Sequence, residues 1–428
     1  MTIAQPFSYF LEQIKIDLIP AATQYLIALA PIALAFVFLV IFWDLWVDYV
    51  RTKQFLGLKY TVLELRLPKE TFKSPRAMEI VLNSLHNTAD GNLFAQFWRG
   101  ETRPWYSLEL ISVEGQVKFL IWTEDRRKHG VMTALYSQFP DIEIREVEDY
   151  TRGVHFDPKT MKVFGCEFAF TKKDSDNGQA YPIKTYIDYG LDKDPKEEFK
   201  TDPLLPLIEW MGAVGPNQQV WFQFLIRAHK KEQRKPGHLF AKHDEWKTMA
   251  EAEINKILKR DPKTKVAGDI NPDTGYAKLP TISKPEQDIV EAIGRSISKL
   301  PFDVCIRAIY LAKREVFNTP FGIGGIIGNM KQFNAENLNG FKPADKWHGQ
   351  LEYPWHDYKD IRRNRFSRMV MRAYKYRSAF YAPFESKTMV LNSEELATVY
   401  HFPGSVSQTP TLDRVPSKRA QAPGNLPV

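Results

Sequence analysis

A basic segment near the C-terminal end carries the side chains best suited to bind a charged ligand. The stretch IRRNRFSRMVMRAYKYR, residues 361–377, contains no acidic residue. Its basic residues are Arg362, Arg363, Arg365, Arg368, Arg372, Lys375 and Arg377. On a helix, apolar side chains from Phe366, Met369, Val370 and Ala373 gather opposite Arg365, Arg368, Arg372 and Lys375. Such a cationic face could bind nucleic-acid phosphates or anionic lipids. The alternative is a docked helix whose arginines are solvated or paired with acids.

The motifs of common catalytic sites do not occur in the sequence. There is no Gly-Lys pair, hence no phosphate-binding P-loop, and no H-E-x-x-H, C-x-x-C or G-x-S-x-G pattern. The cluster GIGGIIGN, residues 322–329, has Ile327 where a dinucleotide fingerprint needs glycine, so it predicts a closely packed helix start. We therefore predict a non-enzymatic chain without a catalytic or cofactor-binding site.

Two histidine-containing stretches are candidates for a metal or an acid-base site. His238 and His243, with Asp244 beside them, are suitable ligand types, but no third ligand is evident and the stretch follows a charged connection. The pair His356-Asp357 in YPWHDYKD is more typical of a polar turn beside aromatic packing than of an acid-base pair. We predict no metal site.

Composition indicates a folded chain with a mixed surface. The 428 residues are 44% hydrophobic and 25% charged, enough for a membrane segment and two ordinary domains. The 58 basic residues are balanced by 51 acidic ones, which argues against a nucleic-acid coat and makes any basic function local. The two cysteines, Cys166 and Cys305, lie in apolar runs, which predicts buried free thiols and a reducing compartment.

One segment is predicted to span a membrane. Residues 18–43 carry no charge, and Tyr25–Trp43 reads YLIALAPIALAFVFLVIFW. About 20 such residues cross a hydrocarbon core. Aromatic residues at its end, Trp43, Trp46 and Tyr49, are typical of the headgroup layer. A cleavable signal peptide is the competing interpretation, but acidic residues precede the segment and no small-residue cleavage site follows.

The flanking charges predict the orientation of this span. Arg51, Lys53 and Lys59 follow it closely, whereas only Lys15 precedes it closely. Because positive residues stay on the cytoplasmic side, the C-terminal bulk is expected in the cytoplasm.

The region after the span alternates strand and helix patterns. A strand is predicted at Tyr60–Pro68, with Leu63, Leu65 and Leu67 on one face, followed by a helix that begins at Ser74-Pro75. Two strands joined by a hairpin at Glu114-Gly115 come next, then a helix over Asp125–Gln138 and a strand around Ile142 and Ile144. The order β-α-β-β-α-β predicts an α+β, ferredoxin-like (split βαβ) unit over residues 58–152.

A second, interrupted ferredoxin-like unit is predicted over residues 153–402. Its strands are assigned to Pro182–Tyr189, Gln219–Ala228 and Phe302–Ala312, with Thr388–Leu391 as a candidate closing strand. Its helices are assigned to 203–214 and 322–333. A helical insertion over about residues 230–300 contains helices near 245–259 and 285–300, and the basic helix over 361–377 follows later.

The end of the chain is predicted to be an extended tail. Asn392 and Glu395 form a capping signature for a short helix through Tyr400, which Pro403-Gly404 ends. Residues 403–428 then show prolines among small polar residues, which is typical of a tether. The predicted domains are therefore 1–57, 58–152, 153–402 and 403–428.

Several phrases in the sequence resemble a known group of membrane proteins. A membrane span is followed by VLELRLPKETFKSPRAMEIVLNSLH, FLIWTEDRRKHGVMTALYSQFPDIEIREVEDY, IRAIYLAKREVFN and VLNSEELATVYHFPG. This order resembles the membrane-proximal N-terminal region of bacterial type IV secretion and conjugation coupling ATPases of the TraG/TraD-like or HerA-like kind. In such proteins a P-loop motor domain would be expected after a segment like APGNLP, whereas this sequence ends at Val428. The resemblance therefore carries over no catalytic residue.

The resemblance implies a place at the bacterial inner membrane. We expect a non-catalytic, single-pass membrane adaptor or scaffold of a type IV secretion or conjugation-like machine, with a separately encoded P-loop ATPase as partner and a homo-oligomer as a further option. The alternative is a membrane-tethered nucleic-acid-binding module in which aromatic side chains on an open sheet face stack on bases.

Overall fold

The structure is a computed structural model that describes residues 19–68, 73–172, 177–192, 201–230, 232–233, 242–243, 246–260, 282–344, 353–404 and 414–415. It is a mixed α and β fold with one N-terminal apolar helix and a large, mainly antiparallel sheet. The chain divides into two compact units. The first contains Met1–Gly57, Gly91–Thr102 and Glu232–His243, and the second contains Leu58–Asp90, Arg103–Lys231 and Asp244–Val428.

The main element of the first unit is a long helix, α2 (Ile19–Gly57), which contains the predicted span. From Ile27 to Leu45 nearly all its large apolar side chains are exposed. The helix is long and apolar enough to cross a membrane. The unit also contains the short helix η2 (Ala95–Arg99) and the strand pair β7 (Glu232–Gln233) and β8 (Lys242–His243).

The first half of the second unit follows the predicted order of elements. It consists of β1 (Tyr60–Pro68), α3 (Pro75–Leu85), β2 (Trp105–Val113), β3 (Gln116–Glu124), the turn η3 (Asp125–Arg127), α4 (Lys128–Gln138) and β4 (Glu143–Val147). β1 pairs antiparallel with both β3 and β4, and β3 pairs with β2. The spatial order of strands is therefore β4-β1-β3-β2.

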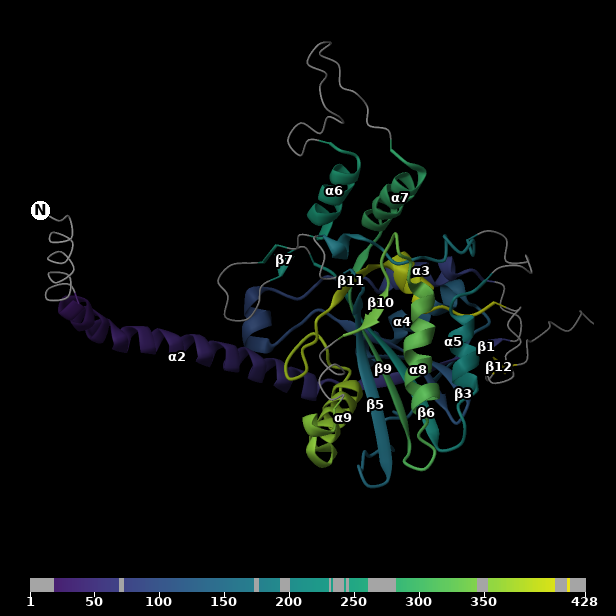
Figure 1. The fold of residues 1–428 in the computed structure, drawn as a ribbon, viewed down its shortest axis with the longest axis horizontal. Helices are drawn as coiled ribbons and strands as arrows, with labels where there is room; N and C mark the ends of the chain where they lie inside the picture. The colour runs from purple at the N-terminus through teal and green to yellow at the C-terminus, as the bar shows by residue number, and fades with distance from the viewer. Residues whose placement is uncertain are drawn as a thin grey trace, which may run out of the picture. The chain divides into compact units, whose positions relative to one another are not determined.

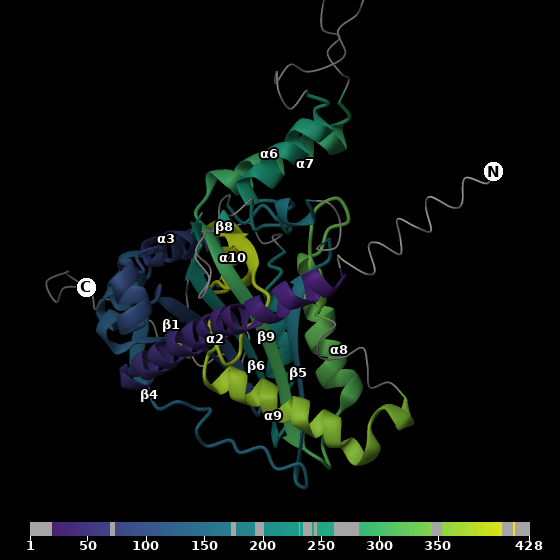
Figure 2. The same cartoon turned by 90° about the vertical axis from the view of Figure 1, so that its left-hand side faces the viewer.

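The second half repeats this order with an insertion. Its elements are β5 (Met161–Phe170), η4 (Gly178–Ala180), α5 (Leu205–Gly212), β6 (Gln218–Ala228), β9 (Pro301–Lys313), α8 (Thr319–Met330), η5 (Lys331–Phe333) and β10 (Phe341–Pro343). β9 pairs with β5 and β6, and β10 pairs with β5, so the order is β10-β5-β9-β6. The insertion contributes α6 (Trp246–Ile257) and α7 (Lys284–Ser298), which pack side by side (Figure 2).

The two halves share one sheet. β2 pairs antiparallel with β6 over nine residue pairs, from Trp105 opposite Arg227 to Val113 opposite Gln219, which gives a ten-stranded sheet. One face is apolar and is covered by α3, α4, α5, α8 and α10 (Ser393–Val399), whose buried side chains form a single core with it. Figure 1 shows α8 near β6 and β9, and α9 (Ile361–Lys375) at β5.

One strand assignment of the second half was wrong, and a second strand has a different place in the sheet. Residues 182–189 form irregular chain followed by turns rather than a strand, because several of their backbone N–H groups donate to side chains instead of a neighbouring strand. Ile183 N donates to Glu395 Oε1, Thr185 N to Asp188 Oδ2, and Tyr186 N to Thr398 Oγ1. The first strand is β5, and β10, rather than residues 388–391, closes the edge beside it. Residues 388–391 belong to β11 (Met389–Asn392), which pairs with the start of β9.

The end of the described chain returns to the sheet. Asn392 and Glu395 form the predicted capping box of α10. β12 (Arg414–Val415) pairs parallel with the last two residues of β1. The rest of the predicted tail, residues 405–413 and 416–428, lies outside the described residues.

One glycine of α8 permits close packing and a second does not, which gives a first prediction. A Cβ atom on Gly322 would lie 2.1 Å from the ring of Tyr310, which is buried and hydrogen-bonded to Gln218. We expect Gly322→Ala to lower the free energy of unfolding by about 1–3 kcal/mol through overpacking. Gly324 has open space around its Cβ position, so Gly324→Ala should raise it by about 0.5–1 kcal/mol. Urea unfolding of both variants measures the difference, and equal effects would contradict this packing.

Candidate functional site

The basic segment forms α9, and most of its arginines are exposed. The helix is preceded by the turns η6 (Pro354–His356) and η7 (Tyr358–Asp360). Asp357 fixes its start, because the two carboxylate oxygens accept hydrogen bonds from the backbone N–H groups of Arg362 and Arg363 at 2.7 and 2.8 Å. The exposed arginines of α9 are called the arginine face and comprise Arg362, Arg363, Arg365, Arg368 and Arg372.

The opposite side of α9 is buried against β5. A Cβ atom on Gly165 would lie 2.4 Å from Val370 Cγ1, so glycine is needed where the helix crosses the strand. Ser367 Oγ donates a hydrogen bond of 3.0 Å to the carbonyl oxygen of Val163. These contacts hold the arginine face on the outer side of the helix.

Lys375 and Arg377 differ from the other basic residues of the segment. Lys375 is half-buried, and its Nζ donates to the carbonyl oxygen of Val154. Arg377 is buried, and its guanidinium bonds two carboxylates, with Nε 2.9 Å from Glu109 Oε1 and Nη2 3.0 Å from Asp149 Oδ1. Arg377 is therefore an internal residue and not part of a surface that could meet lipid or nucleic acid.

Arg377 belongs to a row of polar residues that crosses the second face of the sheet. Glu109 of β2, Gln223 of β6, Arg307 of β9 and Glu167 of β5 stand opposite one another in register. Gln223 Nε2 donates to Glu109 Oε1 at 3.1 Å, and Arg307 joins Gln223 Oε1 to Glu167 Oε1 at 3.2 and 2.7 Å. We call these four residues and Arg377 the polar row. Because all five are buried, their charges must be compensated inside the fold.

The groups next to the polar row have shifted pKa values. Burial acts to raise the pKa of Asp149, but the hydrogen bond and charge of Arg377 outweigh it, so this pKa lies below its usual value. Burial raises the pKa of Tyr150 and Tyr374 well above the usual value. Tyr150 Oη donates to Glu109 Oε2 at 2.9 Å, so this phenol stays protonated as a hydrogen-bond donor. The polar row holds α9 to the sheet. Because its side chains are buried, a ligand cannot reach them from solvent.

Exposed aromatic side chains lie immediately before the arginine face. Trp355 and Tyr358 are 76% and 72% exposed, and Tyr353 and Ile361 are also exposed. The rings of Tyr353 and Trp355 stack with centroids 4.8 Å apart. We call Tyr353, Trp355, Tyr358 and Ile361 the aromatic turn. The sequence predicts a polar turn beside aromatic packing here, although three aromatic residues directly before a basic helix also indicate a binding surface.

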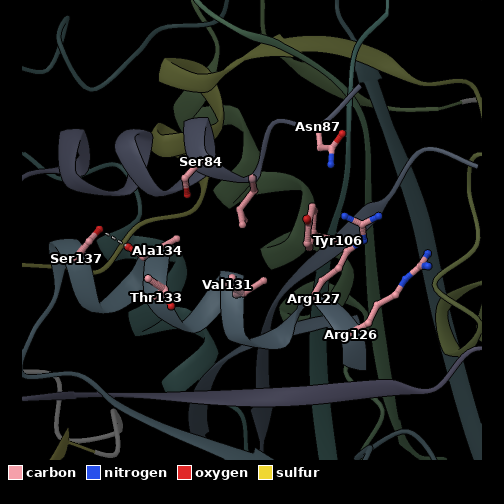
Figure 3. A pocket seen from close by; sticks show the side chains of 11 residues that line it. Ser84, Asn87, Tyr106, Arg126, Arg127, Val131, Thr133, Ala134 and Ser137 are labelled. Carbon is pink, nitrogen blue, oxygen red and sulfur yellow. Dashed lines mark hydrogen bonds between the residues drawn. The ribbon is translucent and has the colours of Figure 1, made fainter. Parts of the chain in front are cut away.

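A groove between α3 and α4 is the second candidate. It has a volume of about 590 Å³ and is drawn in Figure 3, where Arg126 and Arg127 lie at one end and Ser84 and Ser137 at the other. Glu124 Oε2 accepts hydrogen bonds from the Nε atoms of both arginines, at 2.5 and 3.2 Å, and so compensates one of their two charges. Burial raises the pKa of Tyr106 in its wall, so that phenol is neutral at pH 7. The lining residues include no carboxylate, imidazole or thiol that could act as a base or nucleophile.

Other reactive side chains do not gather into a site within the described ranges. No group of three His, Cys, Asp or Glu residues there is placed to hold a metal ion. His238 and Asp244 lie outside those ranges. Cys166 and Cys305 are free and buried, and burial raises the pKa of the Cys305 thiol to about 12, which makes it a poor nucleophile.

Comparison with known proteins identifies the family. A model of a domain of unknown function, DUF8128, matches residues 52–415. The chain belongs to the DUF8128 family. The DUF8128 region contains the sheet, the polar row, the aromatic turn and the arginine face, and it ends at β12. No curated protein matches the chain.

Proposed function

We propose that this DUF8128 protein is a non-catalytic, membrane-anchored adaptor of a type IV secretion or conjugation-like transfer machine. Helix α2 holds it at the bacterial inner membrane, with the sheet on the cytoplasmic side. A P-loop ATPase is its partner. In this proposal each half of the sheet is a ferredoxin-like unit, which is supported by the shared strand order of the two halves.

One observation carries the adaptor role, namely a cationic surface built onto a rigid sheet. The arginine face is exposed, while the other side of α9 is fixed by Val370, Ser367 and, through Arg377, by the polar row. A charged surface that is already ordered loses less entropy when it binds a partner or substrate. The chemistry of this surface is recognition rather than bond making, because arginine donates hydrogen bonds without exchanging protons near pH 7.

Affinity purification of the tagged full chain in mild detergent tests the adaptor proposal. We expect recovery of a P-loop ATPase, further copies of the chain, or both. In this proposal the end of the predicted tail, residues 416–428, docks on the ATPase. A variant truncated after Val415 keeps β12 and removes these residues. This variant should stay in the membrane fraction and lose the ATPase. Recovery of neither partner by the full chain would reject the adaptor proposal.

A second candidate function is binding of single-stranded nucleic acid. The observation that favours it is the aromatic turn beside the arginine face, since stacked rings and cations together bind single strands. The predicted use of an open sheet face does not fit, because the central strands β2, β6 and β9 bury the residues of both faces. In this function, bases stack on Trp355 and Tyr353 while arginines of α9 bind phosphates.

Charge reversal on the arginine face tests whether this surface binds nucleic acid or is only solvated. If nucleic acid binds here, Arg365→Glu with Arg368→Glu should weaken binding of a labelled single strand and lower the slope of log affinity against log salt by about 1–2. The matched control is Lys247→Glu with Lys313→Glu, which reverses two exposed charges elsewhere. Fluorescence anisotropy at several salt concentrations measures both pairs. Equal salt slopes in the two variants would exclude the arginine face as the nucleic-acid site.

A further inference from the structure

Part of the connection between α3 and β2 belongs to the first unit, and we call this part the excursion. Its residues Gly91–Thr102 belong to that unit, although the elements before and after them belong to the second. The chain is fixed where it leaves and returns, because Lys230 Nζ lies 2.8 Å from Asp90 Oδ1 and Arg103 Nη1 donates to the carbonyl oxygen of Ala228 at 2.7 Å. The excursion is therefore an ordered branch of the chain with defined ends.

Aromatic contacts join this excursion to α2. The ring centroids of Trp43 and Phe97 are 5.6 Å apart, and those of Trp46 and Trp98 are 5.5 Å apart. Trp46 Nε1 also donates a hydrogen bond of 3.2 Å to the carbonyl oxygen of Phe97. These are the same tryptophans that the sequence predicts at the membrane boundary.

The backbone of the excursion is shaped for this contact. Gly100 has φ of +74°, and a Cβ atom there would lie 2.6 Å from the carbonyl oxygen of Val50, so only glycine fits against α2 at this point. Asn92 Oδ1 accepts from Ala95 N at 2.8 Å, which orders the start of η2. This close approach between Gly100 and Val50 indicates that the excursion packs specifically against α2.

The outer side of the excursion is apolar and exposed. Leu93, Phe94 and Trp98 are 48%, 58% and 53% exposed, and the rings of Phe94 and Trp98 stack at 6.3 Å. We call these three residues the wedge. Neighbouring side chains of α2, namely Phe42, Leu45 and Tyr49, are exposed as well. Exposing such a patch to water costs free energy in proportion to its apolar area.

We propose that the wedge lies in the headgroup layer of the bilayer that α2 spans. This inference rests on the proposed membrane anchoring. Lipid is the occupant that fits, because the exposed apolar surface of α2 continues through Phe42 and Leu45 to the aromatic residues that hold the wedge. Asp44 is the first exposed charge along α2 in this part of the helix, as expected where the span meets the headgroups. Tryptophan and other aromatic rings prefer the boundary between headgroups and acyl chains. Arg99 follows the wedge, with its guanidinium 5.7 Å from the ring centroid of Phe94, and can reach lipid phosphates from there.

The wedge would give the chain a second membrane contact besides the span. A single membrane-spanning helix can rotate about its own axis and tilt relative to the bilayer normal. A second contact with the membrane beside the helix restricts both motions. The wedge would therefore restrict how the first unit turns relative to the membrane.

Site-directed labelling of the full chain in liposomes tests this proposal. Phe94→Cys and Trp98→Cys each carry a polarity-sensitive fluorophore, and lipids with a nitroxide at a shallow or a deep acyl position quench it. Both native cysteines are buried, so the unsubstituted chain should take up little label. Leu39→Cys, within α2, is the reference for the bilayer interior, and Tyr136→Cys, on α4, is the aromatic control outside the first unit.

The outcomes separate the wedge from the anchor. We expect labels at 94 and 98 to lose most of their fluorescence with the shallow quencher, the label at 39 with the deep quencher, and the label at 136 with neither. Quenching at 39 without quenching at 94 and 98 would overturn the wedge proposal, leave the anchor intact and indicate a protein partner on this surface. A label at 39 that neither quencher reaches would overturn the membrane anchoring itself.

Discussion

Replacing Arg377 with methionine is expected to lower the free energy of unfolding by about 3–5 kcal/mol. The substitution keeps much of the side-chain volume but removes the charge between Glu109 and Asp149, which bond the guanidinium in the wild-type chain. Glu109 is then a buried carboxylate without its cation, and such a group is costly in an interior of low polarity. Urea-induced unfolding, followed by circular dichroism, measures the loss.

The matched control lies on the same helix. Arg372→Met removes an arginine of the exposed face and should change the free energy of unfolding by less than about 0.5 kcal/mol. Limited proteolysis adds a local readout, because Arg377→Met should expose residues 361–377 to cleavage before the sheet unfolds. Similar stabilities for the two variants would show that the polar row does not hold α9.

The second large effect is a fall in stability as the pH rises, caused by Glu395. Burial raises the pKa of this carboxyl to about 8, and the nearby Glu394 acts in the same direction. The folded chain therefore keeps a proton that the unfolded chain releases near pH 4.5. Stability is greatest below that unfolded value and falls as the pH rises from about 4.5 to about 8.

Comparison of Glu395→Gln with the wild-type chain isolates this group. Glutamine does not titrate, so the stability of the variant relative to wild type should increase by about 2–4 kcal/mol between pH 5 and pH 8.5. The amide NH2 of glutamine cannot accept from Ile183 N or Asn392 N, as a carboxyl oxygen does, and this loss lowers the stability of the variant by the same amount at every pH. Asp303 does not interfere. Burial acts to raise its pKa, but the hydrogen bond from His229 and the charge of Arg227 lower it to about 2, so it titrates below this window. His86, whose pKa is lowered by burial, is common to both chains. Parallel pH profiles of the two chains would disprove this role of Glu395.

The sequence predicts the elements of the first half well because local signals are strong there. Leu63, Leu65 and Leu67 alternate along β1 and are buried, and Ser74 with Pro75 begins α3. The turn at Glu114-Gly115 joins β2 to β3. Propensity, capping and turn chemistry agree in this half, so that the local pattern is sufficient.

The second half was harder because long-range contacts decide its strands. The stretch PIKTYIDY has the alternation of a strand, yet Glu395 and Thr398, more than two hundred residues away in sequence, accept its backbone N–H groups. β5 contains Gly165 in its middle, which lowers strand propensity but is required by Val370 of α9. Neither the acceptors of residues 182–189 nor the contact of Gly165 with Val370 can be read from the local sequence pattern.

The candidate site shows the same limit. The pattern of residues 361–377 predicts the helix and its exposed arginines. The same pattern also predicts an exposed Arg377, which is buried in the structure. The partner of Arg377 is a glutamate in the middle of β2, WYSLELISV, where the adjacent Leu108 and Leu110 favour an apolar core. Polar residues in the middle of apolar strands, at Glu109, Gln223, Arg307 and Glu167, were the available signal that a buried polar row exists.

Membrane anchoring through α2 underlies the proposed adaptor role and the wedge, and alkaline extraction of cell membranes measures it directly. The C-terminally tagged full chain should remain in the membrane pellet at high pH. Phe36→Arg with Leu39→Arg should release it, because each arginine near the bilayer centre costs about 2.5–3.5 kcal/mol on the insertion scale. Release of the unsubstituted chain into the supernatant would contradict the anchor and, with it, the proposed membrane adaptor.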